Sequence, residues 1–158
     1  MALDMYLYMV DKQTKKRTLY AYMSQANAIH KFFVNMAQDG FDDNKEYTLS
    51  KDIIKALNIR CMAVIKELEN SPKEVVQECI SVEKDKHGNT IEKYEELWEF
   101  TDTDVSKRIL PTQLGLGFGS RHYDEVYFNY VKYAHKICKK ILRSFDFDKY
   151  DLYYQSNW

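Results

Sequence analysis

The sequence predicts an α+β fold, with a small antiparallel sheet (N-terminal hairpin plus C-terminal strand) packed with about three main helices. Both ends of the chain alternate polar and apolar residues with the two-residue period of a strand. Two long central segments, 50–68 and 124–143, instead carry the three- to four-residue apolar spacing of helices. At 158 residues the chain fits a single domain, 1–158.

The first expected elements are two strands and a helix. Strand "LDMYLYMVD" places Leu3, Met5, Leu7 and Met9 on one face, and the polar turn "KQTKK" joins it to a second strand, "RTLYAYM". Ser24 is expected to cap a helix over 25–39, because its hydroxyl can accept a backbone N–H. Gly40 should end this helix in the left-handed conformation. The predicted buried stripe of the helix is Ile29, Phe32, Phe33 and Met36.

Further along, Ser50 is expected to cap a longer helix that Pro72 prevents from continuing. The segment that follows is ambiguous. The turn His87-Gly88-Asn89 favours a long hairpin, whereas the charged second arm is also compatible with a helix. We interpret residues 80–100 as a variable hairpin or insert. A strong helix is expected from Asp124 to about Arg143, and the tail "YDLYYQSNW" alternates like a strand.

Composition limits the function classes. The formal net charge of −1 argues against bulk nucleic-acid binding. No apolar run is long enough for a membrane span, and the N-terminus lacks the pattern of a signal peptide, so we expect no membrane partner. Three widely spaced cysteines suit a cytoplasmic protein, the host-cell cytoplasm if a phage encodes it, with no disulfide or metal framework. No cofactor is expected. The 13 tyrosines are compatible with a homodimer.

The most distinctive stretch is "LPTQLGLGFGSRHYDE", with glycines at 115, 117 and 119 before a predicted helix. One interpretation is an anion-binding loop, because glycine lets backbone N–H groups approach a phosphate and Arg121 supplies a guanidinium. The other is a turn that packs closely against the sheet. The spacing matches neither a P-loop nor a dinucleotide-binding fingerprint. The candidate ligand-binding residues here are Gln113, Gly117, Gly119, Ser120, Arg121 and His122.

Other candidates lie outside this loop. Asn27 and His30 either line a cleft or sit at the edge of the core, and His30 with His122 would suit general acid–base chemistry if they meet. Tyr154 and Trp158 either tie the tail into the sheet or offer a stacking platform. The pairs Asp102/Asp104 and Asp146/Asp148 fall in expected turns, where local hydrogen bonding is favoured over metal binding.

Four blocks of the chain occur together in order: "ALDMYLYMV", "ANAIHKFFVNMAQDG", "LPTQLGLGFGS" and "DLYYQSNW". This set resembles a family of small proteins from phages, prophages and bacterial genomes with the motifs (G/A)LDMYL, ANAIHK(W/F)F, LPTQxGxxFGS and C-terminal YYQSxW. The chain departs from the family pattern at Ala2, Phe32, Leu114, Leu116 and Gly117. The resemblance implies a context, that of an accessory protein of a mobile element, and no mechanism.

Three functional hypotheses follow. The first is a non-catalytic counter-defence protein that binds a small anionic or nucleotide-like ligand with the loop residues and tail aromatics. The second is a protein–protein inhibitor of a host defence enzyme, such as a CRISPR effector, that uses the charged segment 83–99. The third is a small hydrolase that uses His30 and His122. Of these hypotheses, the sequence favours a binding protein over an enzyme.

Overall fold

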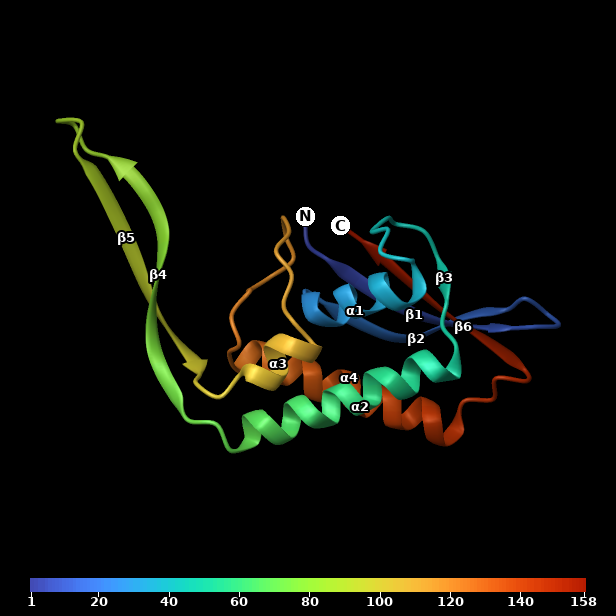
Figure 1. Cartoon of the computed structure of the whole chain (residues 1–158). Coiled ribbons are helices and arrows are strands. Elements are labelled where there is room, and N and C mark those ends of the chain that lie inside the picture. Colours follow the sequence, from blue (N-terminus) through green and yellow to red (C-terminus); the bar gives the residue numbers. More distant parts are fainter.

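The structure, a computed structural model, describes residues 1–158 and confirms the α+β class (Figure 1). It holds a four-stranded antiparallel sheet, a separate two-stranded hairpin and four helices. The elements follow in the order β1 (Asp4–Asp11), β2 (Arg17–Ser24), α1 (Asn27–Ala37), β3 (Tyr47–Thr48), α2 (Lys51–Glu69), β4 (Lys73–Lys84), β5 (Thr90–Phe100), α3 (Asp104–Ile109), α4 (Glu125–Ser144) and β6 (Tyr150–Asn157).

The main sheet has the strand order β2-β1-β6-β3, so the N-terminal hairpin pairs with the C-terminal strand as expected. Strand alternation sets which side chains are buried. Leu7 of β1 lies opposite Tyr154 of β6, and both are almost completely buried on the same face. The other face carries tyrosines that pack on one another, with Tyr6 beside Tyr8 and Tyr22.

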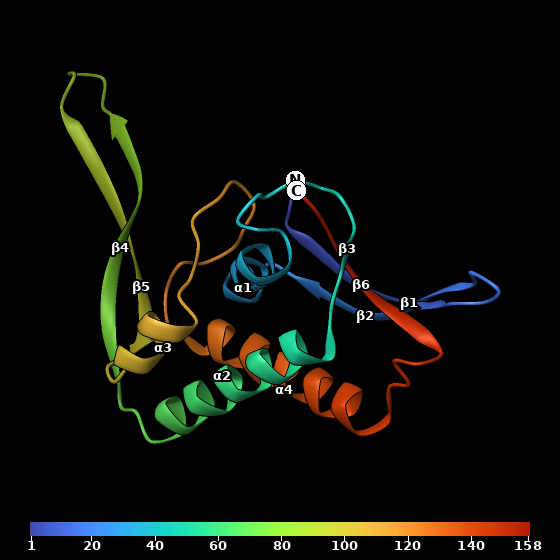
Figure 2. The same cartoon turned by 45° about the vertical axis from the view of Figure 1, so that its right-hand side comes forward.

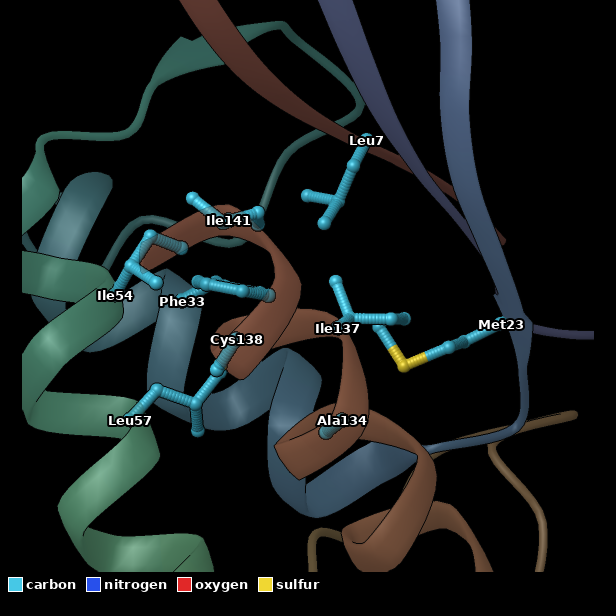
Figure 3. A pocket seen from close by; sticks show the side chains of 9 residues that line it. All are labelled: Leu7, Met23, Phe33, Ile54, Leu57, Ala134, Ile137, Cys138 and Ile141. Carbon is cyan, nitrogen blue, oxygen red and sulfur yellow. The ribbon is translucent and has the colours of Figure 1, made fainter. Parts of the chain in front are cut away.

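The hydrophobic core lies between one face of the sheet and the helices α1, α2 and α4. Figure 3 shows nine apolar side chains from β1, β2 and these three helices converging on one point. The space left among them is about 10 Å³, which is too small for a ligand. The centre of the fold is therefore packed interior, and any binding site must lie elsewhere.

Helix ends test the sequence predictions directly. Ser50 accepts a hydrogen bond from Ile53 N and caps α2 as expected, and Gly40 has the left-handed φ of +81°. The prediction for Ser24 is wrong: it is the last residue of β2, paired with Asp4, and α1 begins at Asn27 without a side-chain cap. The prediction that Met36 is buried is also wrong, since the residue is 42% exposed.

Helix α3 was not expected from the sequence. Its first turn is held by Glu67 of α2, which accepts hydrogen bonds from Val105 N, Ser106 N and Ser106 Oγ. A carboxylate at this end satisfies backbone donors that have no partner within the helix. Six residues are too few to show the apolar spacing of a helix, so the local sequence does not predict α3. The contact with Glu67 of α2 stabilises it instead.

Residues 73–100 resolve into a hairpin, one of the two forms that the sequence left open. Strands β4 and β5 pair only with each other, and both views show them projecting away from the rest of the molecule (Figures 1 and 2). We call this hairpin, Lys73–Phe100, the arm. At the rise per residue of a strand it reaches about 35 Å.

Candidate functional site

The loop from Gln113 to Ser120, here the glycine loop, is tied to α1 by the buried side chain of Asn27. Asn27 Nδ2 donates to the carbonyl oxygens of Phe118 (3.0 Å) and Ser120 (2.9 Å), and Asn27 Oδ1 accepts from Gln113 N (2.9 Å). These bonds join both ends of the loop to one amide group. Asn27 therefore positions the loop and has no exposed surface for a ligand, contrary to the expectation that it lines a cleft.

Two glycines of the loop are needed for close packing. Gly117 has a φ of +73°, and a Cβ there would lie 2.4 Å from Met1 O. Gly119 has a φ of +86°, and a Cβ there would lie 2.9 Å from Gln25 Cβ. Leu3 N also donates to Gly117 O at 2.8 Å. These contacts give the glycines the role of a close-packed turn, the second of the two interpretations of this loop.

His30 stands at the centre of a buried polar network. Its Nε2 lies 3.0 Å from both carboxylate oxygens of Asp42, and its Nδ1 lies 2.6 Å from Tyr154 Oη. Because a carboxylate only accepts, Nε2 carries the proton and Nδ1 accepts from the tyrosine. Burial lowers the pKa of His30 more than Asp42 raises it, which favours the neutral ring.

Residues His30 and Tyr154 are thus placed where no ligand reaches them. Both side chains are fully buried, and the Tyr154 hydroxyl is committed to His30. Trp158 differs, because the residue is 39% exposed while its Nε1 donates to Asp42 Oδ1 at 3.1 Å. The tail is therefore tied into the fold by Tyr154 and still presents Trp158 at the surface.

A pocket lies where the two chain termini meet the glycine loop, and we call it the terminal pocket. Its volume is about 520 Å³, within the range of small-molecule sites. Figure 1 shows the N- and C-termini close together beside the tip of this loop. Of the predicted site residues, only Gln113 and Trp158 line it. The full lining is Met1, Asp42, Gln113, Leu114, Gly115, Leu116, Phe118 and Trp158.

Of the remaining predicted residues, His122 contacts the arm. His122 Nδ1 lies 2.5 Å from Glu99 Oε1, and Nε2 lies 3.0 Å from Glu78 Oε1 without the alignment of a hydrogen bond. Burial lowers the pKa of His122, but the two glutamates outweigh it and the net shift is upward. Ser120 Oγ accepts from His122 N and donates to Asp124, and the exposed Arg121 makes no ion pair.

The two histidines do not form a joint site. His30 is bonded to Asp42 and Tyr154, whereas His122 contacts two glutamates of the arm, and no hydrogen bond connects the rings.

The aspartate pairs do not form a metal site either. Asp146 accepts a hydrogen bond from the backbone N of Asp148, as expected for a turn. The structure has no group of three or more histidine, cysteine or acidic side chains arranged to hold a metal ion.

The arm includes the charged segment 83–99, which was expected as a contact surface of an inhibitor, and strand pairing adds apolar residues to one of its sides. Facing residues on paired strands share a side of the hairpin, so the pairs Val75–Trp98 and Cys79–Tyr94 form one face, and Val82 continues it. We call these five residues the aromatic face. Trp98 is 61% exposed and Tyr94 53%. Alternating residues in "VVQEC" and "YEELW" were the available signal, but the strand assignment was needed to read it.

Comparisons with known proteins add no assignment: no family model, no curated protein and no solved structure matches the chain. None of the helices combines the length and the apolar character that a membrane-spanning segment requires.

Proposed function

We propose that this chain is a non-catalytic binding protein that recognises another protein through the aromatic face of the arm. The observation that carries the proposal is the exposure of Trp98 and Tyr94 on a hairpin that projects from the molecule (Figure 2). A two-stranded hairpin gains little stability on its own in water. Contiguous exposed apolar side chains with polar neighbours are typical of protein interaction surfaces, in which tryptophan and tyrosine often dominate the affinity.

Charge supports a partner of defined character. The arm contains eight acidic residues and four lysines, a formal charge of −4, so the rest of the chain carries +3 to give the net −1. Glu96 faces Gln77 and Glu92 faces Val82, so these two carboxylates lie on the same side of the hairpin as the aromatic face. A basic surface on the partner would pair with them, so we propose a partner with a basic surface that includes an apolar cleft.

The resemblance to proteins of phages and prophages narrows this proposal. Proteins that bind nucleic acid present basic surfaces, which is the surface character proposed for the partner. We therefore propose an accessory protein of a mobile element whose arm blocks the nucleic-acid-binding surface of a host defence protein. A small anionic ligand has less support, because no lysine, arginine or histidine lines the terminal pocket and Arg121 does not contribute to it.

The test compares arm variants in a binding assay. The full-length protein is immobilised and incubated with nuclease-treated bacterial lysate, beside Trp98→Ala/Tyr94→Ala. The control is Ile59→Ala/Met62→Ala, which removes two exposed apolar side chains from α2. We expect the arm variant to lose at least about tenfold of the bound partner, since removing two exposed aromatic contacts commonly costs more than 1.4 kcal/mol. The control should retain it.

The partner found in this way is then purified and titrated directly at low and high salt. Salt-sensitive binding that depends on Trp98 and Tyr94 supports the proposal. Equal retention by all variants would refute it, and so would a partner whose binding is indifferent to salt. Sedimentation of the protein alone distinguishes a homodimer: self-association that Trp98→Ala abolishes would assign the aromatic face to a second copy instead.

A further inference from the structure

The terminal pocket is a second candidate binding site, on a different part of the molecule from the arm. It is formed by three segments that are far apart in the sequence: the N-terminus, the glycine loop and the tail, together with Asp42 from the loop after α1. Both views place the two termini next to each other (Figures 1 and 2). The Asn27 side chain makes hydrogen bonds to the backbone of the glycine loop, so this wall of the pocket is held in place.

The walls of the pocket are apolar. Leu114 and Leu116 are 70% and 83% exposed, an unusual position for leucine side chains that nothing covers. Trp158 contributes a partly exposed indole, and Phe118 packs edge-on against it with the ring centroids 6.0 Å apart. An apolar ring or chain of a ligand would remove these surfaces from water.

Asp42 is the one charged side chain in the lining, which also includes the N-terminal residue Met1 and the amide of Gln113. Its carboxylate favours positive charge and hydrogen-bond donors. It is fixed by bonds from His30 and Trp158, and burial keeps the pKa of His30 low, so the histidine does not neutralise the carboxylate at neutral pH. The indole of Trp158 beside a carboxylate is a combination that attracts organic cations through the face of the ring.

Gln113 lines the pocket and is fixed by its backbone. Its backbone N donates to Asn27 Oδ1, and its side-chain Oε1 is buried without a hydrogen bond, so this oxygen is turned away from the open space of the pocket. The charge of the pocket therefore comes from Asp42 and not from Gln113.

We propose that the terminal pocket binds a small organic cation with an apolar body, of the arylalkylamine type. The ring or chain of the ligand would lie against Leu114, Leu116 and the face of Trp158. The ammonium group would be directed to the carboxylate of Asp42. Anionic ligands would be disfavoured by the same carboxylate.

The experiment uses three probes that share a phenyl ring and differ in charge: 2-phenylethylamine, 2-phenylethanol and 3-phenylpropionate. The chain has two tryptophans, so its ¹⁵N-correlated NMR spectrum has two indole N–H signals. Trp158 lines the pocket and Trp98 lies on the arm, which makes Trp98 an internal control. We expect the amine to shift the Trp158 signal and leave the Trp98 signal in place, with at least about tenfold tighter binding than the propionate.

Two variants test the assignment of the site. Asp42→Asn should weaken amine binding about tenfold and leave the alcohol unchanged, whereas Asp39→Asn, a neighbouring acid outside the lining, should change neither. Leu116→Ala is exposed enough to leave folding intact and should weaken both amine and alcohol by at least about threefold. Equal affinity for amine and propionate, no shift of the Trp158 signal, or full binding by Leu116→Ala would each overturn the proposal.

Discussion

Replacing Asn27 with alanine should destabilise the fold more than any other single polar change in the glycine loop region. The change removes three hydrogen bonds, to Phe118 O, Ser120 O and Gln113 N, all from a side chain with no exposed surface. At about 1 kcal/mol for each bond, the expected loss is about 3 kcal/mol in the free energy of unfolding. For a chain of this size it corresponds to a drop of roughly 6–12 °C in Tm.

The assay is urea unfolding followed by circular dichroism, with the slope compared between variants to confirm that the transition is unchanged. Asn35→Ala is the matched control, because Asn35 lies exposed on the same helix and should change stability by less than about 0.5 kcal/mol. Asn27→Asp should cost at least as much as Asn27→Ala, since the group that replaces Nδ2 cannot donate to the two carbonyls. A loss below about 1 kcal/mol for Asn27→Ala would refute the view that this amide holds the loop.

Three other predictions concern the same framework. Gly117→Ala should cost about 2 kcal/mol or more, measured by urea unfolding, because φ is +73° and the new Cβ would lie 2.4 Å from a backbone oxygen; a neutral effect would contradict the packing role. The stability difference between wild type and His122→Gln should be largest below the usual pKa of 6.5 and vanish as pH rises through the raised folded-state pKa; a difference that grows with pH would contradict the ion pair with the arm. Under native conditions a thiol reagent should modify Cys79 alone, since burial raises the pKa of Cys138 to about 12 and also that of Cys61; rapid native labelling of either buried thiol would contradict the core assignment.

Much of the fold could be predicted from the sequence because the long elements have clear periods. The strands at both ends show the two-residue period of a strand, and α2 and α4 show the apolar spacing of a helix. Ser50 caps α2 through a hydrogen bond to a residue only three positions away. The errors arise where a longer-range contact competes with a local signal. Ser24 has the residue type of a cap, but pairing with Asp4 keeps it in the strand. α3 depends on Glu67, which lies far away in the sequence.

The site was less predictable for the same physical reason. Gln113, Trp158 and His122 were identified because their residue types and neighbours are unusual. The groups that determine what they can do were not identified, because they come from other segments. Asp42 gives the terminal pocket its charge. Glu99 reaches His122 from 23 residues away, which no spacing rule anticipates.

The two sides of the arm differ in what stabilises them. Each of the two facing glutamate pairs, Glu74–Glu99 and Glu78–Glu95, has one member in contact with His122, and Lys93 pairs with Glu83 nearer the tip. The opposite side of the hairpin carries Trp98 and Tyr94, which are both more than half exposed. Folding stability alone gives no reason to leave two large rings in water. The aromatic face is therefore better explained by a surface that becomes covered on binding than by the stability of the isolated hairpin.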